Sequence, residues 1–338
     1  MSMLDEIREQ PDVIERVLAG NQRAAGDALS AMESTTHGLI AARGTSDNAG
    51  RYAQYVWGAL NNYTVGLATP SLFSVYDDPP RLVDAMVVGI SQSGQSPDVV
   101  SVLEEARLQG QPTVAITNDA VSPLAGAAGV VLELHAGEEK AVAATKTYTS
   151  ELANIALIST GGESSDLDKV PKVVASVLEL EPTIEAASAR FVDLEHCAVI
   201  ARGYNHATAF EWALKLQELT YAVSQPFSTA DFLHGPIAVL EPGYPVLAIA
   251  SAGPTLDDVR DVITRSLDAE AHVMIITDDQ STAALSETSI LIPAVGLPEW
   301  LTPIPFAVAC QLFAYHLTRA KGLDVESPRG LKKVTRTL

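Results

Sequence analysis

The chain contains very few cysteines. Its 338 residues include only Cys197 and Cys310, and neither belongs to a CxxC pair or to a cluster of Cys and His. A disulfide framework or a structural zinc site needs several such residues at close spacing, so the sequence offers neither. The composition therefore favours a protein of the reducing cytosol. We expect a cytoplasmic location, no metal site and no bound cofactor.

Positive charge is also scarce. The sequence has 22 Lys and Arg against 42 Asp and Glu, which gives a formal net charge of -20. Binding to nucleic acid needs a basic surface that neutralises phosphates, so this balance argues against a nucleic-acid partner. A small anionic ligand is still compatible with the composition if its own site is locally positive.

Membrane and nucleotide signals are missing as well. No uninterrupted apolar run approaches the roughly 18 residues of a spanning helix, so no membrane partner is expected. The N-terminus has the pattern of an acidic amphipathic helix, without the basic segment and apolar run of a signal peptide. No GxGxxG follows a strand and no GxxxxGK[ST] is present, which disfavours dinucleotide binding and excludes a P-loop.

The chain does contain an internal repeat, with a spacing of about 159 residues. Ala42-Arg43-Gly44 recurs as Ala201-Arg202-Gly203, and Ile116-Thr117-Asn118-Asp119 recurs as Ile276-Thr277-Asp278-Asp279. With 47% hydrophobic and 19% charged residues, the chain has the composition and length of two globular domains. The repeat indicates that one fold was duplicated.

Both copies show short apolar runs that end in Gly, Ser or Asp and pass into helical periodicity, which is typical of βα units and a parallel sheet. We predict strands at 38–42, 85–90, 113–117 and 130–134, and again at 197–201, 246–250, 273–277 and 289–292. Helices are expected in the intervals, including one at 97–108 and one at about 170–191. The segment 224–231 is interpreted as a polar loop. The expected fold class is α/β, with two mostly parallel sheets flanked by helices.

Four parts are expected along the chain. They are an N-terminal helical segment at 1–34, a first α/β domain at 35–165, a linker helix with the second α/β domain at 166–325, and a tail at 326–338. Gly161-Gly162-Glu163-Ser164-Ser165 is the richest cluster of helix breakers near the middle. The tail is basic and too short for another βα unit, so it should pack over another part of the chain or stay mobile.

The two copies differ most in one loop. In the first copy a strand leads into Ser91-Gln92-Ser93-Gly94-Gln95-Ser96-Pro97, whereas the second copy has Ser251-Ala252-Gly253-Pro254. Open α/β sheets bind ligands at the carboxyl ends of their strands, and a helix N-terminus with free N–H groups attracts anions. Ser91, Ser93 and Ser96 would add neutral donors, so we predict a phosphate site. In the alternative, Ser96 merely caps the helix and the other serines only make the turn.

Two further loops of the first copy end strands in the same way. They are Gly44-Thr45-Ser46 and the segment 137–146, which closes with Ala143-Ala144-Thr145-Lys146. Each alone is an ordinary βα turn. Together with the Ser-rich loop they predict three walls of one polar pocket.

A helix of the second copy carries acid and amine candidates. Glu211, Lys215 and Glu218 follow each other at spacings of four and three, which places them on one helix face. The plain alternative is a solvated stripe of salt bridges, which is common on helix surfaces. Because this helix begins at a strand end, where ligands bind, we keep all three as candidate site residues.

Two further candidates follow. His234 lies in a Gly and Pro turn that leaves its imidazole free, and the ordinary pKa of His suits proton transfer near neutrality, although a lone His is more often structural. Lys332 and Lys333 lie in the tail, where a solvated amine is the default. Such an amine gains interest only if the tail folds over the pocket.

These blocks, in this order, resemble the tandem sugar isomerase (SIS) domain family. The likeness is to the isomerase half of glucosamine-6-phosphate synthase and to stand-alone hexosamine-phosphate deaminases, and it covers nearly the whole chain. The matching blocks are Glu6-Ile7-Arg8-Glu9-Gln10-Pro11, Gly44-Thr45-Ser46, Ser91-Gln92-Ser93-Gly94, Val142-Ala143-Ala144-Thr145-Lys146, Glu211 to Glu218, His234-Gly235-Pro236 and Pro328-Arg329-Gly330-Leu331-Lys332-Lys333. The resemblance implies two tandem flavodoxin-like SIS domains.

The resemblance also implies roles. It places a sugar phosphate on Ser46, Ser91, Gln92, Ser93 and Ser96, with Val142 and Ala144 near the sugar. Glu211 and Lys215, taken from their helix face, are kept as substrate-binding candidates. The resemblance assigns Glu218 to proton transfer between C1 and C2, His234 to ring opening, and Lys333 to holding the open-chain sugar. It further implies a homodimer in which His234 serves the neighbouring subunit. No metal or organic cofactor is required by this chemistry.

Some positions depart from the synthase. Ala144 replaces a serine that touches the sugar, Ser96 replaces a threonine, and Arg43 stands where the synthase has a cysteine. Because the chain starts directly at the isomerase half, we expect no glutaminase activity in it. Arg43 to Asp47 and Gln95 to Asp98 are closer to the stand-alone deaminases.

The leading hypothesis is therefore a hexosamine-6-phosphate deaminase that converts glucosamine 6-phosphate into fructose 6-phosphate and ammonia. One alternative is a fructosamine-6-phosphate deglycase or a galactosamine-6-phosphate deaminase. Another, from a different class, is a sugar-phosphate-binding regulator without catalytic activity; the acidic charge and the lack of a basic helix-turn-helix segment disfavour a DNA-bound form of it. The partner in every case is a phosphorylated amino sugar or ketose phosphate.

The role implied for Glu218 gives a first test. Glu218→Gln should retain binding of the sugar phosphate and lose turnover, because the amide fills the same space but accepts no proton. Binding and turnover of the variant and the unchanged protein should be measured side by side. Unchanged turnover would remove Glu218 from the mechanism.

Overall fold

The computed structural model describes residues 2–294 and 296–333. Within this range the chain divides into two units, each built around one sheet. The first sheet unit comprises residues 12–139, 146–168 and 332–333, and the second comprises residues 2–11, 140–145 and 169–331, with residue 295 outside the description. Residues 334–338 of the expected tail also lie outside the described residues. Each unit is considered by itself.

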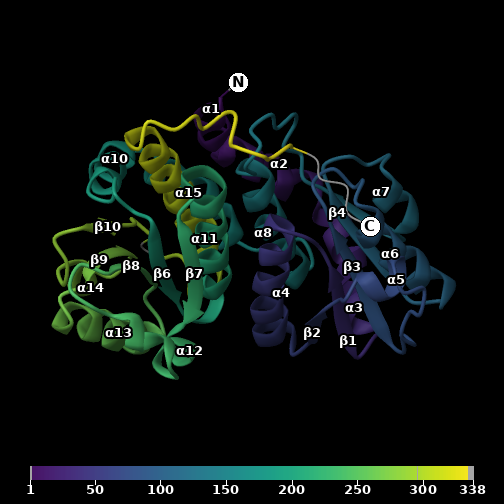
Figure 1. The fold of residues 1–338 in the computed structure, drawn as a ribbon. Coiled ribbons are helices and arrows are strands. Elements are labelled where there is room, and N and C mark those ends of the chain that lie inside the picture. The colour runs from purple at the N-terminus through teal and green to yellow at the C-terminus, as the bar shows by residue number, and fades with distance from the viewer. Residues whose placement is uncertain (1, 295, 334–338) are drawn as a thin grey trace. The chain divides into compact units, whose positions relative to one another are not determined.

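The first sheet unit has five parallel strands in the order β2-β1-β3-β4-β5 (Figure 1). The strands are β1 (His37–Ala41), β2 (Thr64–Leu67), β3 (Ala85–Ile90), β4 (Thr113–Thr117) and β5 (Val130–Glu133). The helices are α2 (Gln10–Gly20, of which residues 12–20 belong here), α3 (Gln22–Glu33), α4 (Thr45–Asn61), α5 (Ser71–Ser74), α6 (Pro97–Leu108), α7 (Pro123–Ala127) and α8 (Lys146–Ser159). Helices α5, α6 and α7 build an apolar core with one face of this sheet, and α4 and α8 pack together on strands of the same unit.

The second sheet unit repeats this plan, with the strand order β10-β9-β8-β6-β7. Its strands are β6 (His196–Ala201), β7 (Val223–Ser228), β8 (Pro245–Ala250), β9 (His272–Thr277) and β10 (Ser289–Leu291). Its helices are α1 (Met3–Arg8), α9 (Val170–Leu178), α10 (Glu181–Ala189), α11 (His206–Thr220), α12 (Thr229–Leu233), α13 (Leu256–Asp268), α14 (Gln280–Ala283) and α15 (Pro303–Ala320). Its short 3-10 turns are η2 (Gly203–Asn205), η3 (Pro236–Val239) and η4 (Glu299–Leu301), and η1 (Leu167–Lys169) lies at the boundary of the two units in the sequence.

Both sheets therefore have the flavodoxin-like order 2-1-3-4-5 when their own strands are counted along the chain. The predicted α/β class, the two parallel sheets and the N-terminal helical segment are confirmed. In each sheet the chain leaves two adjacent central strands in opposite directions, β1 and β3 in one and β6 and β8 in the other. This creates a switch point at the carboxyl end of the strands in both units.

The sequence interpretation missed one strand per sheet. The segment predicted as a polar loop at 224–231 contains β7 and α12, and β2 was not predicted either. Both are edge strands, β2 on β1 and β7 on β6. An edge strand does not need the alternating apolar pattern of a central one, and it tolerates Pro226 because one side of its backbone is unpaired. Those features hid both strands.

The helix predicted at about 170–191 is two helices, α9 and α10, with a break at residues 179–180. Pro182 lies in the first turn of α10, where a missing backbone N–H costs nothing because no partner exists there. In the same way the N-terminal segment is divided into α1, α2 and α3 rather than one helix. No helix in the described part of the chain is long and apolar enough to cross a membrane.

The turn after α8 locks that helix to α3 within the first sheet unit. Gly162 has φ +100, and a Cβ at this position would lie 2.4 Å from the carbonyl oxygen of Gln22. Its amide donates to the Leu157 carbonyl at 3.1 Å, which ends the helix. Only glycine satisfies both the backbone angle and the close approach.

Gly162→Ala should therefore lower the free energy of unfolding by about 2–4 kcal/mol, the sum of a left-handed backbone and a steric clash. Gly110→Ala is the matched control, since Gly110 also has positive φ but its Cβ would meet nothing within 4 Å. Gly110→Ala should lower the free energy of unfolding by only about 1 kcal/mol. Denaturant unfolding of both variants measures the difference, and equal losses would contradict the proposed close approach.

Candidate functional site

The Ser-rich loop connects β3 to α6 at the switch point of the first sheet. The Ser91 amide donates to the Ile116 carbonyl at 3.1 Å, and the Gly94 amide closes a turn on the Ser91 carbonyl at 3.1 Å. Gly94 has φ +61, and a Cβ there would lie 2.2 Å from Ser122 Oγ. The turn is thus fixed by backbone bonds and by close packing, which leaves its hydroxyls for other contacts.

The capping alternative for Ser96 is not supported. Ser96 occupies the N-cap position of α6 with Pro97 next to it, yet its side chain makes no capping hydrogen bond to the described residues. The side chains of Ser91, Gln92 and Ser96 likewise have no hydrogen-bond partner in the part of the chain that the structure describes. Together with the α6 N-terminus they form a set of neutral donors suited to an anion.

Ser46 belongs to the same switch point, because β1 pairs with β3 and both strands end at one edge of the sheet. Ser46 lies in the first turn of α4 and donates to Glu151 Oε1 at 2.7 Å. Arg43, just after β1, pairs through Nε with the fully buried carboxylate of Asp98 at 2.6 Å and is itself half exposed. Arg43 brings a cation to this edge that we had not counted as a phosphate ligand from the sequence.

The equivalent place in the second sheet holds carboxylates of the chain itself. Asp278 Oδ1 accepts from the Ala252 amide at 2.6 Å, and Glu299 accepts from Thr255 Oγ1 at 3.2 Å. Glu299 also lies so close to Gly253 that a Cβ there would be 2.3 Å from Oε2. Burial raises the pKa of Glu299, and the charge of Asp278 adds to the rise. This loop has no need of an external anion and would repel one.

The helix α11 carries the acid and amine candidates. Lys215 is buried with its Nζ 3.3 Å from Glu211 Oε1 and in close contact with Glu218 Oε2. Burial disfavours the charged amine, but the two carboxylates outweigh it and raise the pKa of Lys215 above its usual range. A solvated surface stripe is therefore the wrong interpretation, since the Glu211 and Lys215 side chains are only 2% and 1% exposed. Glu218, at 23%, is the member that a ligand can reach.

Val142 and Ala144 belong to the segment 140–145 of the second sheet unit. Their side chains are partly exposed, whereas those of Ala141, Ala143 and Thr145 are buried. The chain bends through this segment, and its side chains alternate between one packed face and one open face. The open face carries the two residues that the resemblance places near a sugar.

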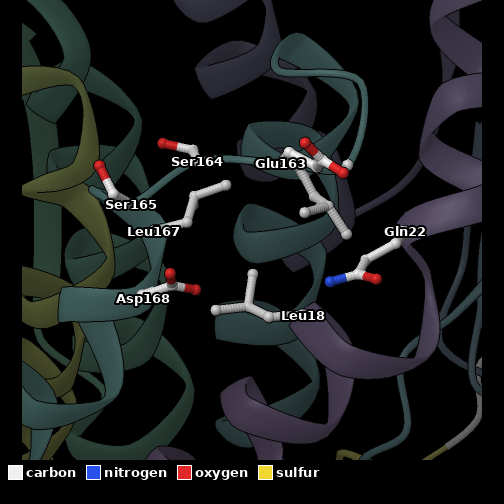
Figure 2. A pocket seen from close by; sticks show the side chains of 9 residues that line it. Leu18, Gln22, Glu163, Ser164, Ser165, Leu167 and Asp168 are labelled. Carbon is white, nitrogen blue, oxygen red and sulfur yellow. The ribbon is translucent and has the colours of Figure 1, made fainter.

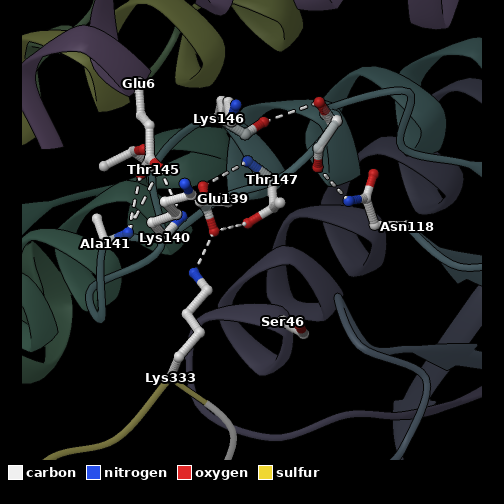
Figure 3. A network of polar contacts seen from close by, with 12 residues as sticks. Glu6, Ser46, Asn118, Glu139, Lys140, Ala141, Thr145, Lys146, Thr147 and Lys333 are labelled. Carbon is white, nitrogen blue, oxygen red and sulfur yellow. Dashed lines mark hydrogen bonds and ion pairs between the residues drawn. The ribbon is translucent and has the colours of Figure 1, made fainter. Parts of the chain in front are cut away.

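The N-terminal Glu6 to Pro11 block holds this segment from one end. The Glu6 side chain, which is fully buried, accepts from the Lys140 amide at 2.5 Å and from the Ala141 amide at 3.2 Å (Figure 3). Hydrogen bonds from backbone amides to a carboxylate are strong, and their loss would leave buried donors without partners.

The other end of the segment is held through a pair of buried amides. Gln10 Nε2 donates to Gln311 Oε1 at 2.9 Å, and Gln311 Nε2 donates to the Thr145 carbonyl at 3.2 Å. The N-terminal block is therefore a support for the backbone of 140–145. This role was not foreseen, although the block itself belongs to the predicted family pattern.

His234 ends α12, and its side chain is exposed in the single chain. The exposed Leu233 and Val239 lie on either side of it in sequence, and Gly235 follows with φ +137. The imidazole is thus free of the surrounding fold, as expected for a Gly and Pro turn.

Lys333 is the last described residue, and it belongs to the first sheet unit together with the Ser-rich loop. Its Nζ lies 2.5 Å from Oε2 of Glu139, whose side chain is fully buried (Figure 3). The tail amine is therefore bound rather than solvated. Lys332, its neighbour, is exposed.

A hollow of about 310 Å³ in the first sheet unit lies elsewhere (Figure 2). It is bounded by Leu18, Gln22, Glu163 and Asp168 among others, and contains none of the predicted site residues. Its acidic wall is unsuited to a phosphate. Among the described residues, no three His, Cys, Asp or Glu side chains are grouped in a way that could hold a metal ion.

The candidate residues thus fall into two groups. Ser46, Ser91, Gln92, Ser93, Ser96 and Lys333 belong to the first sheet unit, and Val142, Ala144, Glu211, Lys215, Glu218 and His234 belong to the second. Within the first unit the Ser-rich loop and Ser46 share one switch point. Sequence reasoning gave no role to Glu6, Asn118 or Glu139. Their signal was weak, since each is a single polar residue: Glu6 and Asn118 lie inside recognised blocks, and Glu139 lies just before one.

A family model described as SIS domain matches the chain twice, at residues 33–161 and 191–320. The isomerizing glutamine–fructose-6-phosphate aminotransferase of Pyrococcus horikoshii is 32% identical over 344 residues, which cover 98% of this chain and 57% of that protein. The chain spans little more than half the length of this relative.

Solved structures with a similar fold point to the same family. The C-terminal domain of glucosamine-fructose-6-phosphate aminotransferase from Francisella tularensis has a TM-score of 0.86 and 26% identity, covering 96% of this chain and 98% of that one. Glucosamine-6-phosphate deaminase from Thermotoga maritima has a TM-score of 0.77 at 17% identity over 100% of both chains, a likeness of fold alone. With two matched domains that take up most of its length, the chain belongs to the SIS domain family.

Proposed function

We propose that this protein is a sugar-phosphate isomerase that deaminates a hexosamine 6-phosphate, converting glucosamine 6-phosphate and water into fructose 6-phosphate and ammonia. The observation that carries the proposal is the cluster on α11, where a buried lysine lies between two glutamates and only Glu218 is open to a ligand. One ammonium against two carboxylates leaves one negative charge. That charge suits the ammonium group of an amino sugar.

The chemistry needs one proton shuttle. In the open-chain aldose, Glu218 removes the proton from C2, which gives an intermediate with a C1–C2 double bond, and returns a proton to C1. The product is a ketose imine at C2, and addition of water releases ammonia and leaves the ketone. A carboxylate can perform both transfers in one position, because C1 and C2 are neighbours. Lys215 holds Glu218 by an ion pair on the same helix.

The phosphate group is assigned to the switch point of the first sheet. Ser91, Gln92, Ser93 and Ser96 would supply neutral donors there, and Ser46 would join them if its hydroxyl turned from Glu151 to the phosphate. The α6 N-terminus and the half-exposed Arg43, which pairs with Asp98, would supply positive potential. The carboxylates at the second switch point support this choice, because they would repel a phosphate. One sugar phosphate per chain follows.

Ring opening is assigned to His234, acting in a neighbouring subunit of a homodimer. The exposure of His234, with the apolar side chains of Leu233 and Val239 close to it in sequence, supports a surface that a second copy covers. Val142 and Ala144 would line the sugar, and the buried Glu211 and Lys215 would complete the substrate site from behind, through the position and charge of Glu218. The two buried, free cysteines support a reducing cytoplasmic setting.

The test is release of ammonia. Purified protein incubated with glucosamine 6-phosphate should yield ammonia and fructose 6-phosphate in equal amounts, and Glu218→Gln should serve as the background. Galactosamine 6-phosphate and a fructosamine 6-phosphate belong in the same panel, because they separate the two other enzymatic assignments. If folded protein binds these sugars and releases nothing from any of them, a non-catalytic regulator is the better description.

A further inference from the structure

Glu139 is a buried carboxylate that the proposed reaction has not yet used. It lies seven residues before α8 begins, in the first sheet unit. Its Oε1 accepts from the Thr147 amide at 3.1 Å, and its Oε2 accepts from Thr147 Oγ1 at 2.8 Å and from Lys333 Nζ at 2.5 Å (Figure 3). Thr147 thus orients the carboxylate by two hydrogen bonds, and Lys333 forms an ion pair with it.

The backbone next to Glu139 is tied to the phosphate loop. The Asn118 amide donates to the Gln92 carbonyl at 3.0 Å. The Asn118 side chain donates to the Gly137 carbonyl at 2.6 Å and accepts from the Ala136 amide at 3.1 Å. All of these residues belong to one unit. Asn118 therefore relates the loop that would hold the phosphate to the carboxylate that holds the tail lysine.

A buried ion pair of this kind is not a simple gain in stability. Removing two charges from water costs free energy that their attraction repays only in part. A fold that merely needed to anchor its tail could do so with apolar contacts. The resemblance gives Lys333 the role of holding the open-chain sugar, and an amine can do this by forming an imine with the ketose carbonyl. The placement of an acid on that amine points to chemistry there.

We propose that Glu139 both holds Lys333 and carries its proton when Lys333 forms an imine with the ketose product, an inference that rests on the proposed function. The ammonium of Lys333 gives one proton to Glu139, and the free amine adds to the C2 carbonyl of the open-chain ketose. In the adduct a proton passes from the nitrogen to the C2 oxygen, which becomes a hydroxyl, and the protonated Glu139 then gives its proton to that hydroxyl. Water leaves, a protonated C2=N bond remains, and Glu139 is a carboxylate again.

The amine can be tested by trapping. The full chain is incubated with fructose 6-phosphate and cyanoborohydride, and the sugar adduct on the Lys333 peptide is followed by mass spectrometry. Glu139→Gln should slow trapping on the order of 10²-fold, because the amide accepts no proton. Affinity for fructose 6-phosphate should change less than about threefold, because the phosphate donors are untouched.

A matched control and a rescue separate chemistry from structure. Glu138→Gln changes the exposed neighbouring carboxylate and should trap at the unchanged rate. Glu139→Ala should be as slow as Glu139→Gln and should recover when formate is added, because a small carboxylate can take the vacated place. Slow trapping without recovery would overturn the proton-carrying role. Trapping by Glu139→Gln at the unchanged rate would overturn the whole inference.

Failure of the proposed function has a different signature. In that case the unchanged protein forms no adduct on Lys333 and releases no ammonia from the sugar panel. If Glu139→Gln does not fold, judged by its thermal unfolding, Glu139→Asp replaces it. This variant keeps the charge but withdraws it by one methylene, so trapping should fall while binding persists, and an undiminished rate would overturn the inference.

Discussion

The structure depends on one topological constraint, the reversal of strand order between two adjacent parallel strands. In each sheet the chain leaves the central pair, β1 and β3 or β6 and β8, in opposite directions, so their following loops separate and leave backbone N–H groups at the strand ends. Such groups need an anion or an acceptor. The two copies differ mainly in the acceptor that is available to these N–H groups.

The two copies meet this need in opposite ways. In the first, the carboxylate of Asp98 takes the Val99 amide and Arg43, but the hydroxyls of Ser91 and Ser96 have no acceptor among the described residues, and these are the donors proposed for a phosphate. In the second, Asp278 takes a loop amide and Glu299 packs against Gly253. The position of Asp278 corresponds in the repeat to Asn118, and this change from amide to acid converts a link between loops into a built-in anion. The duplicated fold thus has one switch point that its own carboxylates occupy and one that we propose for a phosphate.

Several charged side chains of this protein are buried. Glu6, Glu139 and the Glu211 and Lys215 pair are all nearly inaccessible, and each has hydrogen-bonded or charged partners. Burying charge is costly unless it is paired, so these groups restrict the backbone and side chains around them to few arrangements. Glu6 and Gln311 fix the segment 140–145 from its two ends, and Glu139 fixes Lys333. Buried acids therefore hold the backbone and side chains of the proposed site in place. The net charge of the chain does not indicate this role.

The sequence by itself determined the central strands, the long helices, the duplication and the family blocks, because these follow from local periodicity and from spacing along the chain. It predicted β3, β4 and α6 at their observed bounds. It missed β2 and β7, since edge strands carry little apolar pattern, and it joined α9 to α10 across Pro182. Only the tertiary structure decided that Lys215 is buried, that Glu299 occupies the second switch point, and that Glu139 meets Lys333, 194 residues away in sequence. Those facts depend on burial and on contacts between distant segments, and no local pattern of residues encodes them.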